Sequence, residues 1–166
     1  MAQAAKEPKA SRPNMPSYGL ADAESGNGLL PWSWATERLT NSHNYYLATT
    51  RPDAHPHVMP IWGVWMNDSF YFSTGLKSRK ARNLQANPQC VICTETLEES
   101  LIVEGIAEEV PASTIPAAVA EAYQAKYAWK LDPEMGPIYR VRPTTVFGFD
   151  ESDFTGSSTR WTFDNN

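Results

Sequence analysis

Hydrophobic and polar positions divide the chain into a polar leading segment and a longer part made of short apolar runs. Residues 1–30 are rich in Ala, Pro, Gly, Ser and charged residues, and they show no periodic apolar pattern that could be buried. This composition predicts a mobile tail. From residue 31 onwards, apolar runs alternate with turn residues such as Asn, Asp, Gly and Pro, which is typical of a β-rich domain. We therefore expect a disordered tail over residues 1–30 and one folded domain over residues 31–166.

Six of the apolar runs are predicted to be β-strands. Each has the aromatic and β-branched content, or the two-residue alternation, that suits a pleated surface. Gly105 and Pro143 fall inside two of these runs and indicate a bulge, a bend or an edge position there. The predicted strands are residues 45–50, 57–66, 70–74, 89–94, 101–110 and 138–150, followed by a last ordered piece at 159–163.

Helices are predicted at three places. A short helix that includes Leu39 follows two tryptophans, and we expect it to pack on one end of a barrel. A second helix begins after Ser78, and a third, alanine-rich helix covers residues 117–127. Ser113 or Thr114 is expected to be the N-cap of the third helix. Mostly antiparallel strands joined by short turns, with helices inserted, predict a mainly β fold in the form of a small closed or split β-barrel.

Composition narrows the class of protein. A chain of 166 residues is long enough to form one domain with its own core. Its 14 basic and 19 acidic side chains give a formal charge of -5, which argues against a general nucleic-acid or anionic-membrane surface. No apolar run approaches the roughly 20 residues that a membrane-spanning helix needs, and no signal-peptide pattern is present. We expect a cytoplasmic protein without a nucleic-acid or membrane partner.

Two motifs have the residue types of metal or redox sites, but their context favours other readings. Cys90 and Cys93 form a Cys-x-x-Cys motif inside a predicted strand, where residues three apart point to opposite faces. We interpret both as small buried thiols of a reduced protein. His55 and His57 lie on one side of a strand edge beside Asp53, without a third Cys or His nearby in the sequence. No metal site is predicted.

The stretch between strand 70–74 and the second helix is the strongest candidate for a binding site. Ser73 and Thr74 end the strand, Gly75 turns the chain, and Ser78 is a natural N-cap. The first turn of a helix presents unpaired N–H groups and the positive end of the helix dipole to an anion. The basic residues in this stretch are Lys77, Arg79 and Lys80. These features predict a phosphate-binding cradle, and the alternative is a capped surface helix with a solvated basic face.

Several stretches together, in their order along the chain, resemble a known family. They are Thr49 to Asp53, His57 to Trp65, Tyr71 to Gly75, Ser78 to Leu84, Asn87-Pro88 and Thr159 to Phe163. From Trp32 onwards the chain resembles the pyridoxamine 5'-phosphate oxidase-like family, also called the flavin/deazaflavin oxidoreductase split-barrel superfamily. The resemblance implies a six-stranded antiparallel Greek-key split β-barrel. It also implies a homodimer, with FMN or a deazaflavin (coenzyme F420) in grooves between the subunits.

The resemblance also implies which residues contact the cofactor. Those implied at its phosphate or its ribityl hydroxyls are Ser73, Thr74, Lys77, Ser78, Arg79 and Lys80. Those implied along the edge of its ring system are Met59, Pro60, Ile61 and Trp62, with His57 near the ring. Arg160 and Trp161 are expected to reach the groove. The alternative for these two is that the last residues only complete the final strand.

The apolar character of the predicted strand 57–66 supports the expected homodimer. This strand is apolar on both faces, which a lone barrel with one solvated face does not need. A second subunit would cover the additional apolar face.

The implied function is hydride transfer between the bound cofactor and a small, planar, apolar substrate. The sequence has no recognisable nucleophile motif, so we expect the cofactor to carry the chemistry, and we assign no catalytic residue. Vitamin B6 oxidation is not expected, because the additional substrate residues of a true pyridoxamine 5'-phosphate oxidase have no counterpart in the C-terminal region. The alternative function is a flavin-binding, cofactor-storage or sensor protein without a dedicated substrate.

Overall fold

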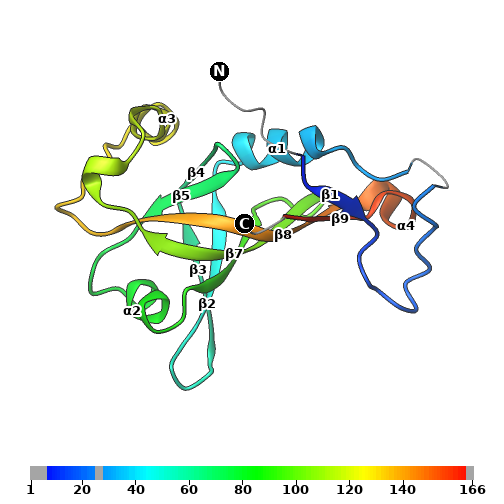
Figure 1. Cartoon of the computed structure of the whole chain (residues 1–166), viewed down its shortest axis with the longest axis horizontal. Helices are drawn as coiled ribbons and strands as arrows, with labels where there is room; N and C mark the ends of the chain where they lie inside the picture. Colours follow the sequence, from blue (N-terminus) through cyan, green and yellow to red (C-terminus); the bar gives the residue numbers. More distant parts are fainter. Residues whose placement is uncertain (1–6, 25–27, 164–166) are drawn as a thin grey trace.

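The computed structural model describes residues 7–24 and 28–163. These residues form an antiparallel β-sheet with four α-helices and two 3-10 turns (Figure 1). The helices are α1 (Trp32–Asn41), α2 (Arg79–Ala86), α3 (Ala117–Tyr127) and α4 (Phe154–Ser157), and the 3-10 turns are η1 (Ala112–Thr114) and η2 (Glu151–Asp153). The strands are β1 (Lys9–Ser11), β2 (Tyr45–Thr50), β3 (Pro56–Ile61), β4 (Val64–Met66), β5 (Ser69–Ser73), β6 (Gln89–Thr94), β7 (Glu99–Glu109), β8 (Ile138–Asp150) and β9 (Thr159–Thr162).

All the strand pairs are antiparallel, and the sheet is not closed. The main order is β1-β9-β8-β7-β6-β2-β3, while β5 pairs with β8 and β4 away from this path. The register of β7 shifts between Glu104 and Gly105, at the point where Gly105 pairs with Pro143, which confirms the predicted bulge. Within the described residues β3 pairs only with β2, so the barrel remains open along β3. The prediction of a mainly antiparallel β fold with inserted helices is confirmed.

One predicted strand is broken at Trp62 and Gly63. β3 and β4 stop on either side of these two residues, so the prediction of one continuous strand over residues 57–66 is wrong. Gly63 is buried, and a Cβ atom there would overlap the Phe70 ring and lie 2.8 Å from the Tyr71 carbonyl oxygen. The backbone passes so close to β5 that only glycine fits. The break directs β3 and β4 to different parts of the sheet.

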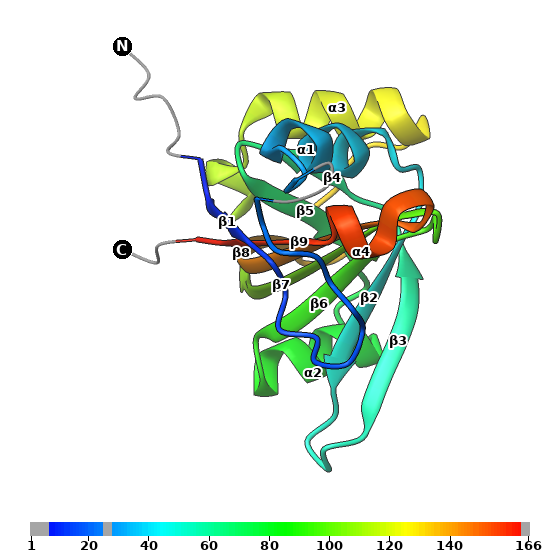
Figure 2. The same ribbon diagram turned by 90° about the vertical axis from the view of Figure 1, so that its right-hand side faces the viewer.

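The main core is formed by buried residues of the sheet and α1, together with Leu84 of α2. Both views show α1 and α3 on one side of the sheet and α2 on the opposite side (Figure 1, Figure 2). Helix α1 confirms the predicted helix around Leu39, which is fully buried together with Ala35. Other members of this core are Tyr45, Leu47, Phe70, Phe72, Ile92, Leu101, Val103, Val141, Val146 and Trp161.

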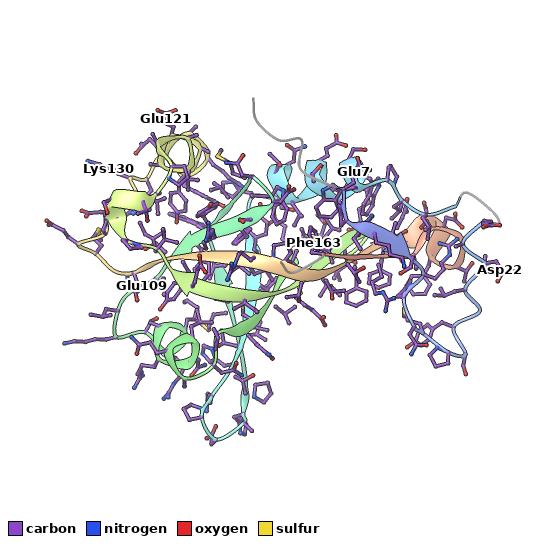
Figure 3. The ribbon with its side chains drawn as sticks, in the orientation of Figure 1. Glu7, Asp22, Glu109, Glu121, Lys130 and Phe163 are labelled. Atoms are coloured by element: carbon purple, nitrogen blue, oxygen red, sulfur yellow. The ribbon has the colours of Figure 1, made fainter. Side chains whose placement is uncertain are left out.

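Helix α3 covers a second, smaller apolar cluster at one end of the sheet. In Figure 3 this is the end at which Glu121 and Lys130 are labelled. Its span confirms the predicted helix over residues 117–127. The predicted N-cap is wrong, because Ser113 and Thr114 lie in or at the end of η1 and the N-cap position is Pro116. The fixed φ of proline suits the entry to a helix without any side-chain cap. The second cluster contains Val64, Tyr71, Val119, Tyr123, Leu131 and Ile138.

Part of the leading segment is ordered. Strand β1 pairs with β9, so the prediction of a mobile tail over residues 1–30 does not hold for this strand. Arg12 follows β1, and its guanidinium donates hydrogen bonds to four carbonyl oxygens. The acceptors are Ala21 (3.0 Å), Asp22 (3.2 Å), Gly156 (2.7 Å) and Ser158 (2.9 Å). Two of these acceptors are 144 and 146 positions away along the chain, which local composition does not reveal. Residues 1–6 and 25–27 lie outside the described residues.

The two cysteines are free thiols on β6. Cys90 is buried and Cys93 is half-buried. Burial raises the pKa of both thiols, that of Cys90 to about 12, which disfavours the reactive thiolate form. No group of three or more His, Cys, Asp and Glu side chains in the described part of the chain is placed to hold a metal ion. None of the helices described here is both long enough and apolar enough to cross a membrane.

Candidate functional site

The turn between β5 and α2 forms an N-capped helix start. Ser78 Oγ accepts a hydrogen bond from the Ala81 N–H (3.1 Å) and lies 3.0 Å from Thr74 Oγ1, which confirms the predicted N-cap. This cap satisfies one of the first N–H groups of α2. The N–H groups of Arg79 and Lys80 have no intrahelical acceptor, because they belong to the first turn. They add to the positive end of the helix dipole in front of α2.

Basic side chains gather in front of this helix start. Burial lowers the pKa of the His57 imidazole, and the nearby charges of Arg51, Lys80 and Arg79 lower it further. Burial also lowers the pKa of the Lys80 ammonium, and no carboxylate among the described residues pairs with it. The Nε atom of Arg51 is buried without a hydrogen-bond partner. A partly desolvated cation without a counter-ion is well suited to bind an anion.

A buried amide connects α2 to the strands beside it. Asn83 is fully buried, and its Nδ2 donates to Thr49 Oγ1 on β2 (2.9 Å). Thr49 Oγ1 also lies 3.5 Å from His57 Nδ1 on the neighbouring strand β3. The position of the helix start is therefore coupled to the strand that carries His57.

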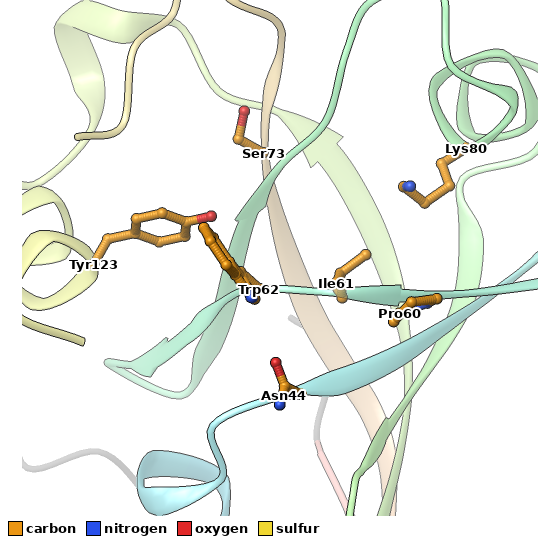
Figure 4. Close-up of a pocket in the computed structure, with 7 residues that line it drawn as sticks. All are labelled: Asn44, Pro60, Ile61, Trp62, Ser73, Lys80 and Tyr123. Atoms are coloured by element: carbon orange, nitrogen blue, oxygen red, sulfur yellow. The ribbon is translucent and has the colours of Figure 1, made fainter. Parts of the chain in front are cut away.

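A cavity of about 310 Å³ opens beside these cations (Figure 4). Lys80 reaches towards it from α2, while Tyr123 from α3 and the Trp62 ring stand on the opposite side. The lining residues are Asn44, Pro60, Ile61, Trp62, Ser73, Lys80 and Tyr123. One end of the cavity is basic and the other is aromatic.

The aromatic end presents flat ring surfaces. Trp62 is 43% exposed, and its ring stacks on Tyr127 with a centroid separation of 4.8 Å and an interplanar angle of 10°. Burial raises the pKa of Tyr123 to about 12, so its phenol is neutral near neutral pH. Flat rings and a neutral hydroxyl suit a planar heterocyclic ligand.

A second compartment of about 290 Å³ adjoins the cavity and shares Ser73 and Tyr123 with it. It lies between the β5–α2 turn and the segment that follows α3. Its other lining residues are Thr74, Gly75, Trp129, Lys130, Leu131, Asp132 and Met135. This compartment provides room for a second small molecule or for the remainder of a larger one.

Most of the residues predicted from the sequence lie in or beside the cavity. Those that line it are Pro60, Ile61, Trp62, Ser73 and Lys80. Those at the helix start beside it are Thr74, Lys77, Ser78 and Arg79, of which Lys77 and Arg79 are exposed. His57 and Met59 lie on β3, on the face that also carries Ile61. Their role at the ring stays a prediction.

Trp161 does not reach the cavity. It is 1% exposed and packs edge-to-face on Trp32 of α1, with 5.5 Å between the ring centroids. A ring buried in this way is unable to cover a ligand, so the prediction that Trp161 contacts the cofactor is wrong. Arg160 lies on β9 beside β1, where its Nε donates to Ser11 Oγ (3.3 Å). The burial of Trp161 agrees with the alternative, in which it completes the final strand, while the role of Arg160 in the groove stays a prediction.

Asn44 and Tyr123 also line the cavity, although neither was predicted from the sequence as a site residue. Tyr123 belongs to the predicted face of the third helix, but helical spacing alone does not say which aromatic residue meets the cavity. Asn44 precedes β2, and its Nδ2 donates to the Glu95 carboxylate (2.9 Å). A polar residue between a helix and a strand has the pattern of an ordinary turn residue, so the sequence does not indicate that Asn44 lines a cavity.

The fold is an open, mainly antiparallel β-barrel, and its cavity has a basic end and an aromatic end. A family model for pyridoxamine 5'-phosphate oxidase matches residues 35–149. The chain belongs to this family. A comparison with curated proteins found no match.

Solved structures of similar fold come from proteins with different functions. One is an F420 reductase, with 28% sequence identity, coverage of 70% of this chain and 98% of that chain, and a TM-score of 0.57. Another is an FAD-binding protein from Mesorhizobium loti, with 19% identity, coverage of 81% and 96%, and a TM-score of 0.59. A third is the heme storage protein HutZ from Vibrio cholerae, with 20% identity, coverage of 68% and 86%, and a TM-score of 0.53. At 19% and 20% identity the last two support the fold alone.

Proposed function

We propose that this protein is an oxidoreductase that binds FMN or a deazaflavin and transfers a hydride between this cofactor and a small, planar substrate. The observation that carries the proposal is the cavity with a basic end at Lys80 and an aromatic end at Trp62 and Tyr123. A flavin-type cofactor has a phosphate and a planar ring system, which match these two ends. Membership of the family and the similarity to an F420 reductase support the same class of ligand.

The residues present fit both parts of such a cofactor. The unpaired Lys80 ammonium, the buried orphan Nε of Arg51 and the helix start suit a phosphate. Ser73 also lines the cavity, and its hydroxyl suits a polyol chain. A bound flavin or deazaflavin would supply the hydride chemistry. The chain itself would hold the phosphate, orient the ring against Trp62 and limit the access of water to it.

One observation favours a second function, which is cofactor binding or storage without a dedicated substrate. No carboxylate lines the cavity in the described part of the chain. The Tyr123 phenol, with its pKa raised to about 12, is a weak acid, and Lys80 is committed to the basic end. A site for proton transfer normally contains a group whose pKa lies near the working pH.

Cofactor titration followed by a turnover assay tests the proposed function. The purified protein is titrated separately with FMN and with coenzyme F420, and binding is followed by fluorescence. We expect one of the two to bind with one molecule per chain. The loaded protein is then given a reduced nicotinamide or reduced deazaflavin donor and a small quinone acceptor. Turnover supports the oxidoreductase, binding without turnover supports storage, and failure to bind either cofactor contradicts both.

We also propose that the protein forms a homodimer through the outer face of the β3, β2, β6 and β7 strands. Tyr46 and Val58 are 49% and 54% exposed on this face, and Ile106 is exposed on β7. Large exposed apolar patches are typical of protein interfaces. Pro60, which lines the cavity, pairs with Tyr46 across β3 and β2. A partner on this face would therefore also cover one side of the cavity.

Sedimentation of wild-type protein and a charged variant tests the homodimer. We expect a stable dimer at micromolar concentration, and we expect Val58→Glu to be monomeric and to bind cofactor more weakly. The substitution leaves the monomer folded because Val58 is exposed. Leu97→Glu, at a position that is 81% exposed on the turn between β6 and β7, is the matched control and should remain a dimer. A wild-type monomer that retains cofactor would contradict the proposal.

A further inference from the structure

We propose that Lys126 is a positioning residue of this cavity, and that its ammonium fixes the aromatic end at which a planar ring binds. The nature of that ligand rests on the proposed function, whereas the positioning of the aromatic end does not. Lys126 lies on α3, is half-buried, and is not one of the residues that line the cavity. It therefore acts through the residues that it holds.

The Lys126 ammonium contacts acceptors from three separate elements. Its Nζ lies 2.8 Å from Tyr45 Oη in β2, 3.2 Å from the Gly63 carbonyl oxygen at the strand break, and 3.4 Å from the Thr40 carbonyl oxygen in the last turn of α1. An ammonium group has three donors, so these contacts use all of them. No carboxylate among the described residues forms an ion pair with Lys126.

The end of α1 makes this position favourable for a cation. The last carbonyl groups of a helix lack intrahelical partners and carry partial negative charge. Lys126 donates to one of these carbonyl oxygens, that of Thr40. The Tyr45 hydroxyl accepts a hydrogen bond from Lys126 and donates one to a second, the Leu39 carbonyl oxygen (2.6 Å). The Lys126 ammonium also lies 4.8 Å from the centre of the Tyr45 ring. Burial lowers the pKa of Lys126 to about 8, and the nearby charge of Glu95 opposes this shift.

Two of the segments that Lys126 contacts, and α3 itself, contribute residues to the aromatic end of the cavity. Tyr45 and Gly63, which Lys126 contacts, are the chain neighbours of the lining residues Asn44 and Trp62. Lys126 itself lies on α3 close to the lining residue Tyr123. One helical turn separates these two residues of α3. Figure 4 shows Asn44, Trp62 and Tyr123 on the side of the cavity opposite Lys80. One side chain thus sets the relative placement of three lining residues.

Tyr127, the next residue on α3, also bonds the backbone of Gly63. Its hydroxyl accepts a hydrogen bond from the Gly63 N–H (2.9 Å) and lies 2.8 Å from the Gly63 carbonyl oxygen. Its ring stacks on Trp62. Gly63 interrupts the strand, so it lacks the ladder bonds that fix an ordinary strand residue. The contacts from α3 replace those bonds.

The Lys126→Met variant tests the proposal without relying on activity. Methionine keeps an unbranched apolar side chain and removes the donors. Protein labelled with ¹⁵N-tryptophan gives one indole signal per tryptophan, and the Trp62 signal is assigned by its loss in Trp62→Phe. We expect this signal to shift in Lys126→Met while the melting temperature stays within about 4 °C of wild type. We expect FMN or F420 affinity to fall about tenfold.

Two further variants make the test specific. Lys9→Met removes the same charge from exposed β1 and should leave the Trp62 signal and the affinity unchanged. Tyr127→Phe removes only the hydroxyl, which bonds Gly63 and also donates to the His43 carbonyl oxygen (2.7 Å), and it should shift the Trp62 signal in the same way. If Lys126→Met does not fold, Lys126→Gln, which removes the charge but keeps a polar side chain, takes its place and its results are interpreted in the same way.

The possible results separate this inference from the proposed function. A shifted Trp62 signal with weaker cofactor binding supports the positioning role. An unchanged Trp62 signal overturns the positioning role. A shifted signal with unchanged affinity overturns the part of the proposal in which a planar ring binds at this end. A shifted Trp62 signal in a protein whose wild type binds neither cofactor supports the positioning of the aromatic end and contradicts the proposed function.

Discussion

Replacing Trp161 by alanine is expected to lower the free energy of unfolding by about 3–5 kcal/mol, as for other large buried aromatic residues. The side chain is 1% exposed and forms part of the main core with Trp32 and Phe70. A Cβ atom on Gly148 would lie 2.8 Å from the Trp161 ring, so the indole packs directly against the backbone of β8. The indole removes a large apolar area from water, and alanine would leave a cavity in its place. Urea unfolding of the cofactor-free protein measures the change.

Trp129→Ala is the matched control for Trp161→Ala. Trp129 is 51% exposed after α3, so its removal should change the free energy of unfolding by no more than about 0.5 kcal/mol. If Trp161→Ala left stability near wild type and weakened cofactor binding instead, the indole would belong to the binding site after all. The two variants therefore distinguish a core tryptophan from a ligand contact.

Replacing Lys80 by alanine is expected to weaken cofactor binding about tenfold to a hundredfold, because a charge-assisted contact contributes roughly 1.5–3 kcal/mol. Lys80 lines the cavity, is half-buried, and lacks a carboxylate partner in the described part of the chain. A ligand phosphate would give it the missing counter-ion. Isothermal titration with the cofactor that wild type binds measures the effect.

Arg82→Ala provides the control for Lys80→Ala. Arg82 is exposed on the same helix and does not line the cavity, so its loss should change affinity little. Equal losses in both variants would indicate a general effect of net charge rather than a direct contact. An unchanged affinity in Lys80→Ala would place the phosphate elsewhere.

The positions of the strands could be predicted because each strand carries its own local signal. The predicted spans 45–50, 89–94 and 138–150 agree with β2, β6 and β8 at both ends. The N-cap at Ser78 was equally local, since capping depends on residues three positions apart. The basic end of the cavity follows directly from this one short stretch.

The features that could not be predicted from the sequence depend on contacts between distant parts of the chain. Gly63 was a visible interruption of an apolar run, but only the approach of Phe70 shows why the strand stops there. Trp161 lies in a segment poor in apolar residues, and its burial depends on α1 packing across β9. Tyr123 becomes a cavity residue because of how α3 docks on the sheet. Sequence patterns give the faces of helices and strands, but not which face meets which.

The pairing of β1 with β9 has a consequence for the order of folding during synthesis. Thr162 Oγ1 donates to the Lys9 carbonyl oxygen across 153 positions of the chain. Contacts of such long sequence separation form late, because closing a large loop costs entropy before any contact is gained. During synthesis on the ribosome, β1 emerges before β9 and is unable to form its strand pair until β9 has been made. Until then, the edge of β8 that β9 later covers stays open to pairing with other chains.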